Sequence, residues 1–375
     1  MRVACVRNWP TGRPFSTCSP THTIGTKGIS IVSDTDSDLS LFRPDLTAAD
    51  VCAVTRAIES GRVAAGSEVA AFESRTGQRL GRRTIATCSG SVALWIALRH
   101  ILSGDRREVI TSPIVCEGVV DVIRFAGGTP VFADVVPQTL ALSGESLADC
   151  LTERTGAVVY VHYDGLVGES APVRNLCESA GIPLIEDCAS VLGGTTRDGP
   201  VGRDGEFGVF SLHATKSITS GEGGLLAWTP RSPSKISPID GYPKVGMSDV
   251  TAAMANAQFD RLDDILDARR DVATGYAERL GDVPAAELLT GAPGSRGTWT
   301  SALIRFDSAH GRVLAERALI GDGVPVRGVD AILGASLPPG ADQAWNTVLR
   351  VPLHTRMTEQ DIDRVTKLLS EAVGR

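Results

Sequence analysis

Short apolar runs alternate with helical runs between residues 84 and 228, and this alternation restricts the folds open to the chain. TIATC precedes SVALWIALRHIL, EVITSP precedes GVVDVIRFAGG, and the further apolar runs are VFADV, AVVYVHY, PLIED, FGVFSL and GLLAW. Apolar runs of about four to eight residues that alternate with helices are typical of parallel strands joined by crossover helices. The sequence therefore predicts an α/β fold whose mostly parallel sheet is wrapped by helices.

The segments on either side of this region have a different composition. Residues 1–38 are rich in Ser, Thr, Pro and Gly with little periodicity, which indicates either a disordered leader or an over-extended start of the reading frame. After a loop rich in Pro and Ser, a long helical stretch from Ser248 to Leu280 leads into a smaller α/β unit. We therefore expect a large domain over 39–245, followed by a connecting helix and a small C-terminal domain over 246–375.

Composition and charge exclude several classes of protein. The net charge of −7 and the lack of a Lys/Arg-rich run argue against nucleic acid as a partner. No apolar run approaches the roughly 18 residues of a membrane helix, and the N-terminus has no apolar signal segment. The eight cysteines are scattered without a CxxC pair, so they predict neither a zinc site nor a disulfide framework. A globular enzyme in the reducing cytoplasm is the expected class.

Two polar residues follow buried strands in this pattern. Asp187 ends the run PLIED, and Lys216 comes shortly after the run FGVFSL. The carboxyl ends of the strands in an open α/β sheet form the edge at which ligands bind. A lysine and an acid there suit pyridoxal 5'-phosphate (PLP), because the lysine can form a Schiff base and the acid can pair with the pyridine nitrogen. Each residue also has an ordinary interpretation when taken alone: a surface lysine in a turn, and an acid that caps a strand-to-loop turn.

A phosphate site is expected at the start of the helix VALWIALRHI. Ser89, Gly90 and Ser91 come directly before it, so backbone N–H groups, a close approach at the glycine and serine hydroxyls are available to an anion. Ser211, five residues before Lys216, can add a further hydroxyl. The spacing is also compatible with a simple helix cap.

The order of these features, with a phosphate cap, an acid and a lysine before a small C-terminal domain, matches the fold type I PLP enzymes. In finer detail the chain resembles the DegT/StrS family of sugar aminotransferases over about residues 41–275. The most specific segment is FSLHATK with EGG downstream; the others are RPDLTAADV, SGRVAAGSEVAAFE, CSGSVALWIAL, EVITSP, GGTPVFADV, VVYVHYDG, PLIEDCAS and MSDVTAAMANAQFDRLDDI. The resemblance implies a mostly parallel seven-stranded sheet flanked by helices, with a smaller C-terminal α/β domain.

The resemblance also implies functional roles. Lys216 would hold PLP as the internal aldimine and Asp187 would pair with its pyridine nitrogen, while Gly90, Ser91 and Ser211 would bind its phosphate. The enzyme would be a homodimer in which each subunit reaches into the phosphate site of its neighbour. It would transfer an amino group from glutamate or glutamine to the ketone of a nucleotide-linked sugar or a cyclitol. The implied setting is a specialised pathway, such as antibiotic or cell-surface sugar synthesis.

Three positions depart from the pattern of the family, and all three belong to the expected cofactor site. Cys116 stands where an aromatic residue usually stacks on the pyridine ring, although a small buried cysteine without a role is an equally open interpretation. Ser190 replaces a Gln or His that contacts the ring hydroxyl, so this contact would be lost or made through water. Lys244 replaces a cross-subunit Asn, and its ammonium can bind phosphate.

These departures leave other functions open. PLP enzymes of this fold also run eliminations, dehydrations and other carbon-centred reactions, in which His213 and Glu222 beside the lysine would act on protons or substrate hydroxyls; structural roles in the loop are the alternative for both. His162 is expected at a strand end beside the site, and substrate contacts are expected from C-terminal loops, including Trp299 and Arg327. A non-catalytic binding protein that kept the fold is a third hypothesis, and the retained lysine and acid argue against it.

Overall fold

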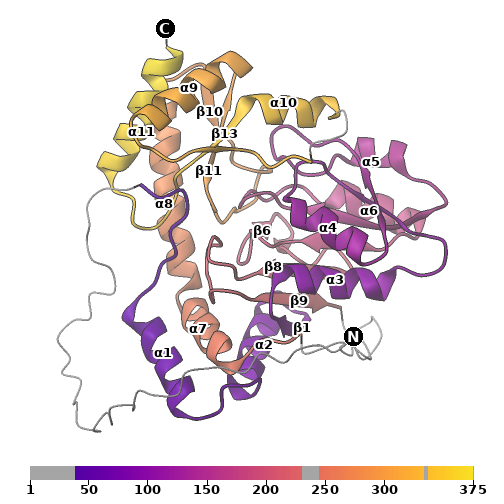
Figure 1. Cartoon of the computed structure of the whole chain (residues 1–375). Coiled ribbons are helices and arrows are strands. Elements are labelled where there is room, and N and C mark those ends of the chain that lie inside the picture. Colours follow the sequence, from indigo (N-terminus) through magenta and orange to yellow (C-terminus); the bar gives the residue numbers. More distant parts are fainter. Residues whose placement is uncertain (1–38, 230–244, 333–336, 375) are drawn as a thin grey trace, which may run out of the picture. The chain divides into compact units, whose positions relative to one another are not determined.

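Seven strands form the main sheet in the computed structural model, which describes residues 39–229, 245–332 and 337–374 (Figure 1). The ladders β2–β3, β2–β4, β4–β5 and β5–β8 are parallel, whereas β9 runs antiparallel to both of its neighbours. The expected mostly parallel seven-stranded sheet is confirmed, while the predicted leader and Lys244 lie outside the described residues. In spatial order the strands are β1 (Arg83–Thr87), β9 (Gly224–Trp228), β8 (Phe207–Ser211), β5 (Leu184–Asp187), β4 (Thr155–Val161), β2 (Glu108–Thr111) and β3 (Thr129–Phe132).

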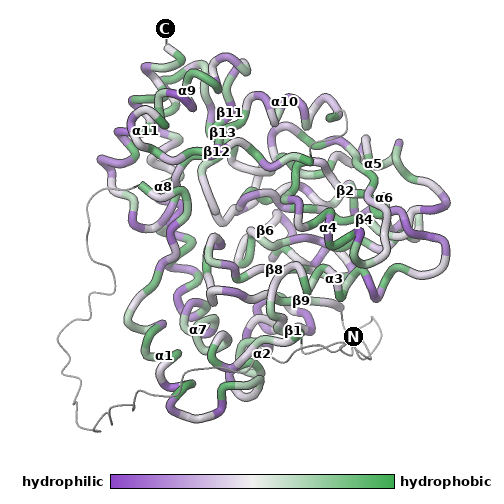
Figure 2. The backbone as a smooth tube through the Cα atoms, in the orientation of Figure 1, coloured by the Kyte–Doolittle hydropathy of each residue, from purple (hydrophilic) through white to green (hydrophobic). Residues whose placement is uncertain are grey.

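Alternate residues of the central strands face opposite layers of helices. In β4, Val159 packs with α3 and α4, whereas Val158 and Tyr160 pack with α5 and α6. In β5, Ile185 packs with α3 and α4, and Leu184 packs with α5 and α6. Because both faces are covered, residues 157–161 of β4 and 184–185 of β5 are apolar without alternation, and they form continuous apolar runs in the sequence (Figure 2). The helices around this sheet are α1 (Ala48–Glu59), α2 (Ser67–Leu80), α3 (Gly90–Ile101), α4 (Glu117–Phe125), α5 (Gly144–Cys150), α6 (Ala171–Ala180), α7 (Asp249–Asp260) and α8 (Leu262–Leu280).

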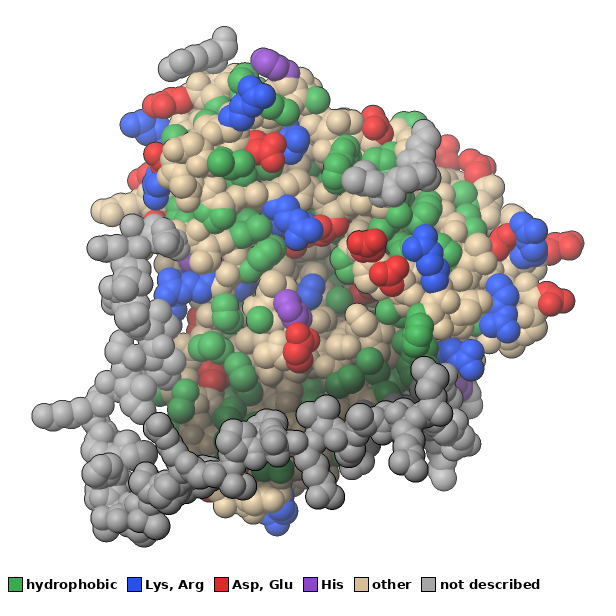
Figure 3. Space-filling view, viewed as in Figure 1, with side chains coloured by type: hydrophobic (Ala, Val, Ile, Leu, Met, Phe, Trp, Pro, Cys, Tyr) green, Lys and Arg blue, Asp and Glu red, His purple; other side chains and the backbone are tan. Residues whose placement is uncertain are grey.

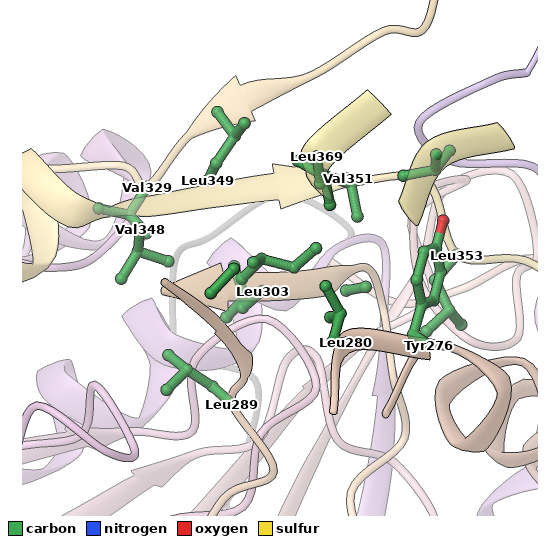
Figure 4. Packing of buried hydrophobic residues seen from close by; sticks show 14 of the residues in the cluster. Tyr276, Leu280, Leu289, Leu303, Val329, Val348, Leu349, Val351, Leu353 and Leu369 are labelled. Carbon is green, nitrogen blue, oxygen red and sulfur yellow. The ribbon is translucent and has the colours of Figure 1, made fainter. Parts of the chain in front are cut away.

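A second, four-stranded sheet lies in the C-terminal part of the chain, and all of its ladders are antiparallel. Its core contains Leu303, Leu349 and Leu369, and Tyr276 of α8 packs into it while its hydroxyl donates to the carbonyl of Pro352 at 2.9 Å (Figure 4). The elements are β10 (Ala286–Leu288), β11 (Ala302–Phe306), β13 (Val348–Val351) and β12 (Arg327–Gly328), with α9 (Ala309–Gly321), α10 (Pro339–Thr347) and α11 (Glu359–Val373); a separate small hairpin consists of β6 (Thr195–Thr196) and β7 (Gly199–Pro200). The division into domains over 39–245 and 246–375 stays a prediction.

The helical stretch expected from Ser248 to Leu280 is two helices rather than one. Arg261 stands between α7 and α8 with a non-helical backbone. Its guanidinium bonds to the carboxylates of Asp45 and Asp50 at 3.0 Å each, and these contacts tie the break to the start of the described chain. No helix in the described residues is long and apolar enough to cross a membrane.

His354 is buried beside the second sheet in an unusual setting. His354 is only 3% exposed, and within the described residues neither ring nitrogen has a hydrogen-bond partner. Burial, together with the charges of Arg269 and Arg43, lowers its pKa from 6.5 to about 4. The imidazole is therefore neutral in the folded protein at ordinary pH.

We expect His354 to make the protein less stable in mild acid. Below about pH 6.5 the unfolded chain protonates this histidine while the folded chain does not, so the free energy of unfolding falls until the pH reaches about 4. The contribution amounts to about 3 kcal/mol. Chemical denaturation at a series of pH values should show that His354→Leu lacks this slope, with His310→Leu as the exposed-site control. A variant that loses stability as steeply as the wild type would show that another group is responsible.

Candidate active site

Lys216 and Asp187 lie at the same edge of the main sheet. Asp187 is the last residue of β5, and Lys216 follows β8, which is parallel to β5 and ends at Ser211. Both line two adjoining cavities of about 300 Å³ each, and the space-filling view shows a hollow bordered by acidic, basic and histidine side chains (Figure 3). The first, here the α3 cavity, is also lined by Ser89, Gly90, Ser91, Cys116, Ser211, His213 and Glu222. The second, here the Arg350 cavity, is also lined by Cys116, His162, Tyr163, Asp164, Ser190, Thr300, Arg327, Asp330 and Arg350.

The start of α3 forms a cradle for an anion. The Ser89 side chain caps the helix by accepting from the N–H of Val92 at 3.2 Å, so the cap interpretation of this residue is correct. The N–H groups of Gly90 and Ser91 have no acceptor within the described chain. Strand β9 passes so close that a Cβ on Gly224 would lie 2.5 Å from the backbone nitrogen of Gly90. Free N–H groups at a helix N-terminus, with serine hydroxyls beside them, favour binding of a phosphate.

Asp187 is an almost fully buried carboxylate, and its Oδ1 accepts from the N–H of Ala189 at 2.9 Å. Burial raises its pKa, and the Ala189 N–H, the charge of Lys216 and the nearby imidazole of His162 offset this only in part. The chain alone therefore compensates the charge of Asp187 incompletely. A positively charged ligand group beside it would stabilise the ionised form.

Glu186, the residue before Asp187, takes a structural role behind the site. It accepts hydrogen bonds from the backbone N–H groups of Gly202 and Asp204 and from Nε2 of His162 at 2.9 Å. Burial opposes its ionisation, but these hydrogen bonds outweigh burial and lower its pKa. Nδ1 of His162 accepts from a backbone N–H, so the ring proton lies on Nε2. Glu186 lines neither cavity, because successive residues of a strand point to opposite faces and its side chain lies on the face away from that of Asp187.

Lys216 is held by one of the residues that depart from the family pattern. Its Nζ donates to Oγ of Ser190 at 3.0 Å. The carbonyl of Ser190 in turn accepts from the hydroxyls of Thr298 at 2.5 Å and Thr300 at 3.2 Å. The lysine is thereby connected to the segment that leads into β11.

Cys116 lies between the two cavities at the start of α4. Burial raises the pKa of its thiol, and the nearby charge of Asp187 adds to this effect. The sulfur is therefore a neutral thiol at ordinary pH, and it presents a small apolar surface to the site.

His213 and Glu222 flank the lysine at the α3 cavity. Nδ1 of His213 lies 3.0 Å from the hydroxyl of Thr215, and its Nε2 lies 3.6 Å from Oε1 of Glu222. Both side chains line the cavity, so the structure leaves open both a structural and a chemical role for them.

The sequence was also compared with known protein families. The model of the DegT/DnrJ/EryC1/StrS aminotransferase family matches residues 44–233 and 241–329, which is more than half of the chain. The chain belongs to this family. It is therefore a PLP-dependent aminotransferase with the fold type I architecture, as the sequence predicted.

Several solved structures share the fold over nearly the whole chain, among them the aminotransferase TlmJ. TlmJ from Streptoalloteichus hindustanus is 26% identical with a TM-score of 0.84, over 90% of this chain and 99% of its own. AtS13 from Actinomadura melliaura is also 26% identical with a TM-score of 0.80, over 90% of this chain and 99% of its own. DesI, solved in the presence of its TDP-sugar product, is 29% identical with a TM-score of 0.80, over 91% of this chain and 94% of its own.

The described residues of this DegT-family aminotransferase fit PLP. One space contains free helix N–H groups and hydroxyls for a phosphate, a buried acid with an incompletely compensated charge, and a lysine amine. A Cβ on Gly90 would lie 2.9 Å from Cβ of Ser211, so the cradle depends on the glycine. Six of the predicted cofactor residues line the α3 cavity, namely Gly90, Ser91, Cys116, Asp187, Ser211 and Lys216; Ser190 lines the Arg350 cavity, and Lys244 is not described.

The sequence interpretation missed most of the Arg350 cavity of this aminotransferase. It expected Arg327, which does line the cavity, but it did not single out Asp164, Asp330 or Arg350. It also expected Trp299 as a substrate contact, whereas this side chain is buried and lines neither cavity. The carbonyl of Trp299 accepts from the buried guanidinium of Arg269 at 2.8 Å, and such a contact fixes the loop rather than a ligand.

Proposed function

We propose that this aminotransferase transfers an amino group from glutamate or glutamine to the ketone of a nucleotide-linked sugar or a cyclitol. The main observation behind this proposal is that Lys216, Asp187 and the start of α3 line one cavity. A second cavity, lined by polar and charged groups, adjoins it. The resemblance to DesI, whose structure was solved with its TDP-sugar product, supports a sugar-type acceptor. A specialised pathway such as antibiotic synthesis is the setting that this proposal favours.

The proposed roles follow from the positions of the residues. Lys216 would hold the cofactor through its amine, and its Nζ would carry the proton at the substrate carbon. Asp187 would keep the pyridine nitrogen protonated, and the N–H groups of Gly90 and Ser91 with the hydroxyls of Ser91 and Ser211 would hold the phosphate. When bound, PLP supplies a ring that withdraws the electrons left on the substrate carbon.

Three further residues complete the proposed site. Cys116 would lie against the ring of the cofactor, and Ser190 would orient the lysine amine through the hydrogen bond that it accepts. Lys244 would reach the phosphate site of the partner subunit in a homodimer. The six described cysteines are free thiols, which supports our proposal of a reducing cytoplasmic setting.

The two half-reactions test this function separately. Addition of glutamate or glutamine to the PLP-loaded protein should convert the cofactor to its amine form, which is visible as a change in absorbance. Addition of TDP-4-keto-6-deoxyglucose or 2-keto-myo-inositol should then restore the original spectrum and yield the aminated product. A cofactor that stays unchanged with both donors would contradict amino transfer from them and favour elimination chemistry at the same site.

The role of Cys116 leads to a prediction about cofactor affinity. Cys116→Tyr places a ring beside the pyridine, and stacking should lower the Kd of PLP about two- to tenfold. Because Cys116 lines the open space of both cavities, the larger side chain enters no packed core. Titration of the cofactor-free protein with PLP measures the effect, with Cys116→Ser as the control that changes little. Weaker binding by the tyrosine variant would show that this position does not face the ring.

A further inference from the structure

One wall of the Arg350 cavity is a buried ionic cluster that the proposed cofactor site does not use. Arg350 of β13 lies at its centre with a side chain only 4% exposed, and its Nε lies 2.9 Å from Oδ2 of Asp164. Its Nη2 donates to Oδ2 of Asp330 at 3.1 Å and to the hydroxyl of Tyr163 at 2.6 Å. Arg327, on the neighbouring strand β12, donates to Oδ1 of Asp330 at 2.7 Å.

The charges in this cluster cancel one another. Two guanidinium groups face two carboxylates, so the wall has no net charge. Burial opposes the charge of Arg350, but Asp164, Tyr163 and Asp330 outweigh burial and raise its pKa, so the guanidinium stays ionised. An incoming carboxylate or phosphate therefore meets no excess positive charge at this wall.

The position of the Asp164 carboxylate depends on a strained backbone conformation of this residue. Asp164 has a φ of 51°, in the left-handed region, which costs on the order of 1 kcal/mol for a residue other than glycine. Gly165 lets this turn pack against the backbone of Trp299 and Thr300, since a Cβ on Gly165 would lie 2.4 Å from the nitrogen of Thr300. The hydroxyl of Ser301 donates to Oδ2 of Asp164 and fixes the carboxylate further.

Nε of Arg350 lies within ion-pair distance of Asp164 but, within the described residues, makes no hydrogen bond, and Asp164 and Arg350 each have one further polar atom without a partner. Oδ1 of Asp164 and Nη1 of Arg350 have no hydrogen-bond partner in the part of the chain that the structure describes, and both residues line the cavity. One is an acceptor and the other a donor, and a hydroxyl group is the ligand chemistry that can satisfy both.

We propose that Asp164 and Arg350 bind neighbouring hydroxyls on the ring of the acceptor, and that they select a neutral polyhydroxylated ring over a keto acid. This inference rests on the proposed amino transfer to a keto-sugar or cyclitol. Hydrogen bonds to charged groups contribute more than those between neutral groups. Because the acceptor ring carries hydroxyls and glutamate carries none, this pair should determine acceptor affinity more than donor affinity.

The test measures the two half-reactions of Asp164→Asn. Asparagine tolerates the left-handed backbone and keeps the shape of the side chain, so the variant should fold and load PLP as the wild type does. The concentration of 2-keto-myo-inositol that half-saturates the acceptor half-reaction should rise about tenfold or more. Half-saturation by 2-oxoglutarate should occur at an equal or lower concentration, because the wall becomes positive by one charge. The rate of the donor half-reaction with glutamate should stay within about twofold of the wild type.

Asp330→Asn is the matched comparison. It removes the same charge from the same cluster, but both oxygens of Asp330 already accept from Arg327, Arg350 or Tyr163. Its effect on the cyclitol half-reaction should therefore be clearly smaller than that of Asp164→Asn. Equal effects of the two variants would overturn hydroxyl binding by Asp164, and so would equal weakening of the donor and acceptor half-reactions.

Failure of the proposed function itself would look different. In that case the wild type would show no conversion of the cofactor by either donor, before any variant is compared. A wild type that completes both half-reactions with the keto-cyclitol or the TDP-keto-sugar, but prefers 2-oxoglutarate to both as acceptor, would overturn only the proposed selectivity of this wall.

Discussion

Replacing Lys216 with alanine should lower the rate of amino transfer by at least about 10³-fold. The variant loses both the amine that binds the cofactor covalently and the group that moves the proton at the substrate carbon. Its fold should be preserved, because the side chain makes a single hydrogen bond, to Ser190, within the described chain. Mass spectrometry after borohydride reduction should find a PLP-sized addition on the Lys216 peptide of the wild type and none on the variant.

Lys367 provides the control for this experiment. It lies on α11 with a side chain 75% exposed, and its nearest acid is Glu371 at 4.0 Å. Lys367→Ala should keep the wild-type rate and the adduct on Lys216. The chain has five lysines, so the peptide that carries the addition can be assigned without ambiguity. An adduct on another lysine in the wild type would contradict the assignment of Lys216.

The sequence allowed the main sheet to be predicted because its strands are buried on both faces. Each of the seven apolar runs became a strand, from TIATC at β1 to GLLAW at β9. The pattern could not show that β9 runs antiparallel, since strand direction depends on the connection and not on apolar content. The break between α7 and α8 was equally hidden, because it depends on contacts of Arg261 with residues more than 200 positions earlier.

The candidate site also has one part that the sequence predicts and another part that it does not. Asp187, Lys216 and Gly90 follow or open regular elements, so their positions could be derived from the order of strands and helices. The Asp164–Arg350 pair joins the turn after β4 of the main sheet to strand β13 of the second sheet, and no local pattern connects the two residues. One signal was present: Arg350 interrupts the apolar run VLRVPL, and a charged residue in a buried strand requires a partner.

Asp187→Asn should lower the rate of the donor half-reaction about 10²- to 10³-fold. Burial raises the pKa of this carboxylate, and among the described residues one N–H, from Ala189, donates to it, while Lys216 and His162 oppose the effect of burial only in part. A protonated pyridine nitrogen supplies the missing positive charge, and in return the acid keeps that nitrogen protonated. Asparagine still accepts from the N–H of Ala189, so the fold and the strand end should be preserved, while the ring loses its counter-charge and withdraws electrons less well.

Single-turnover kinetics with glutamate, followed by absorbance, would measure this loss, and equilibrium titration would show weaker binding of PLP in the same variant. Asp198→Asn, in the exposed turn between β6 and β7, is the matched control and should behave as the wild type. Because the carboxylate and not the shape of the side chain is proposed to act, Asp187→Glu should retain more activity than Asp187→Asn. An asparagine variant with the wild-type rate would mean that Asp187 does not pair with the ring nitrogen, and that its burial at the end of β5 serves the fold alone.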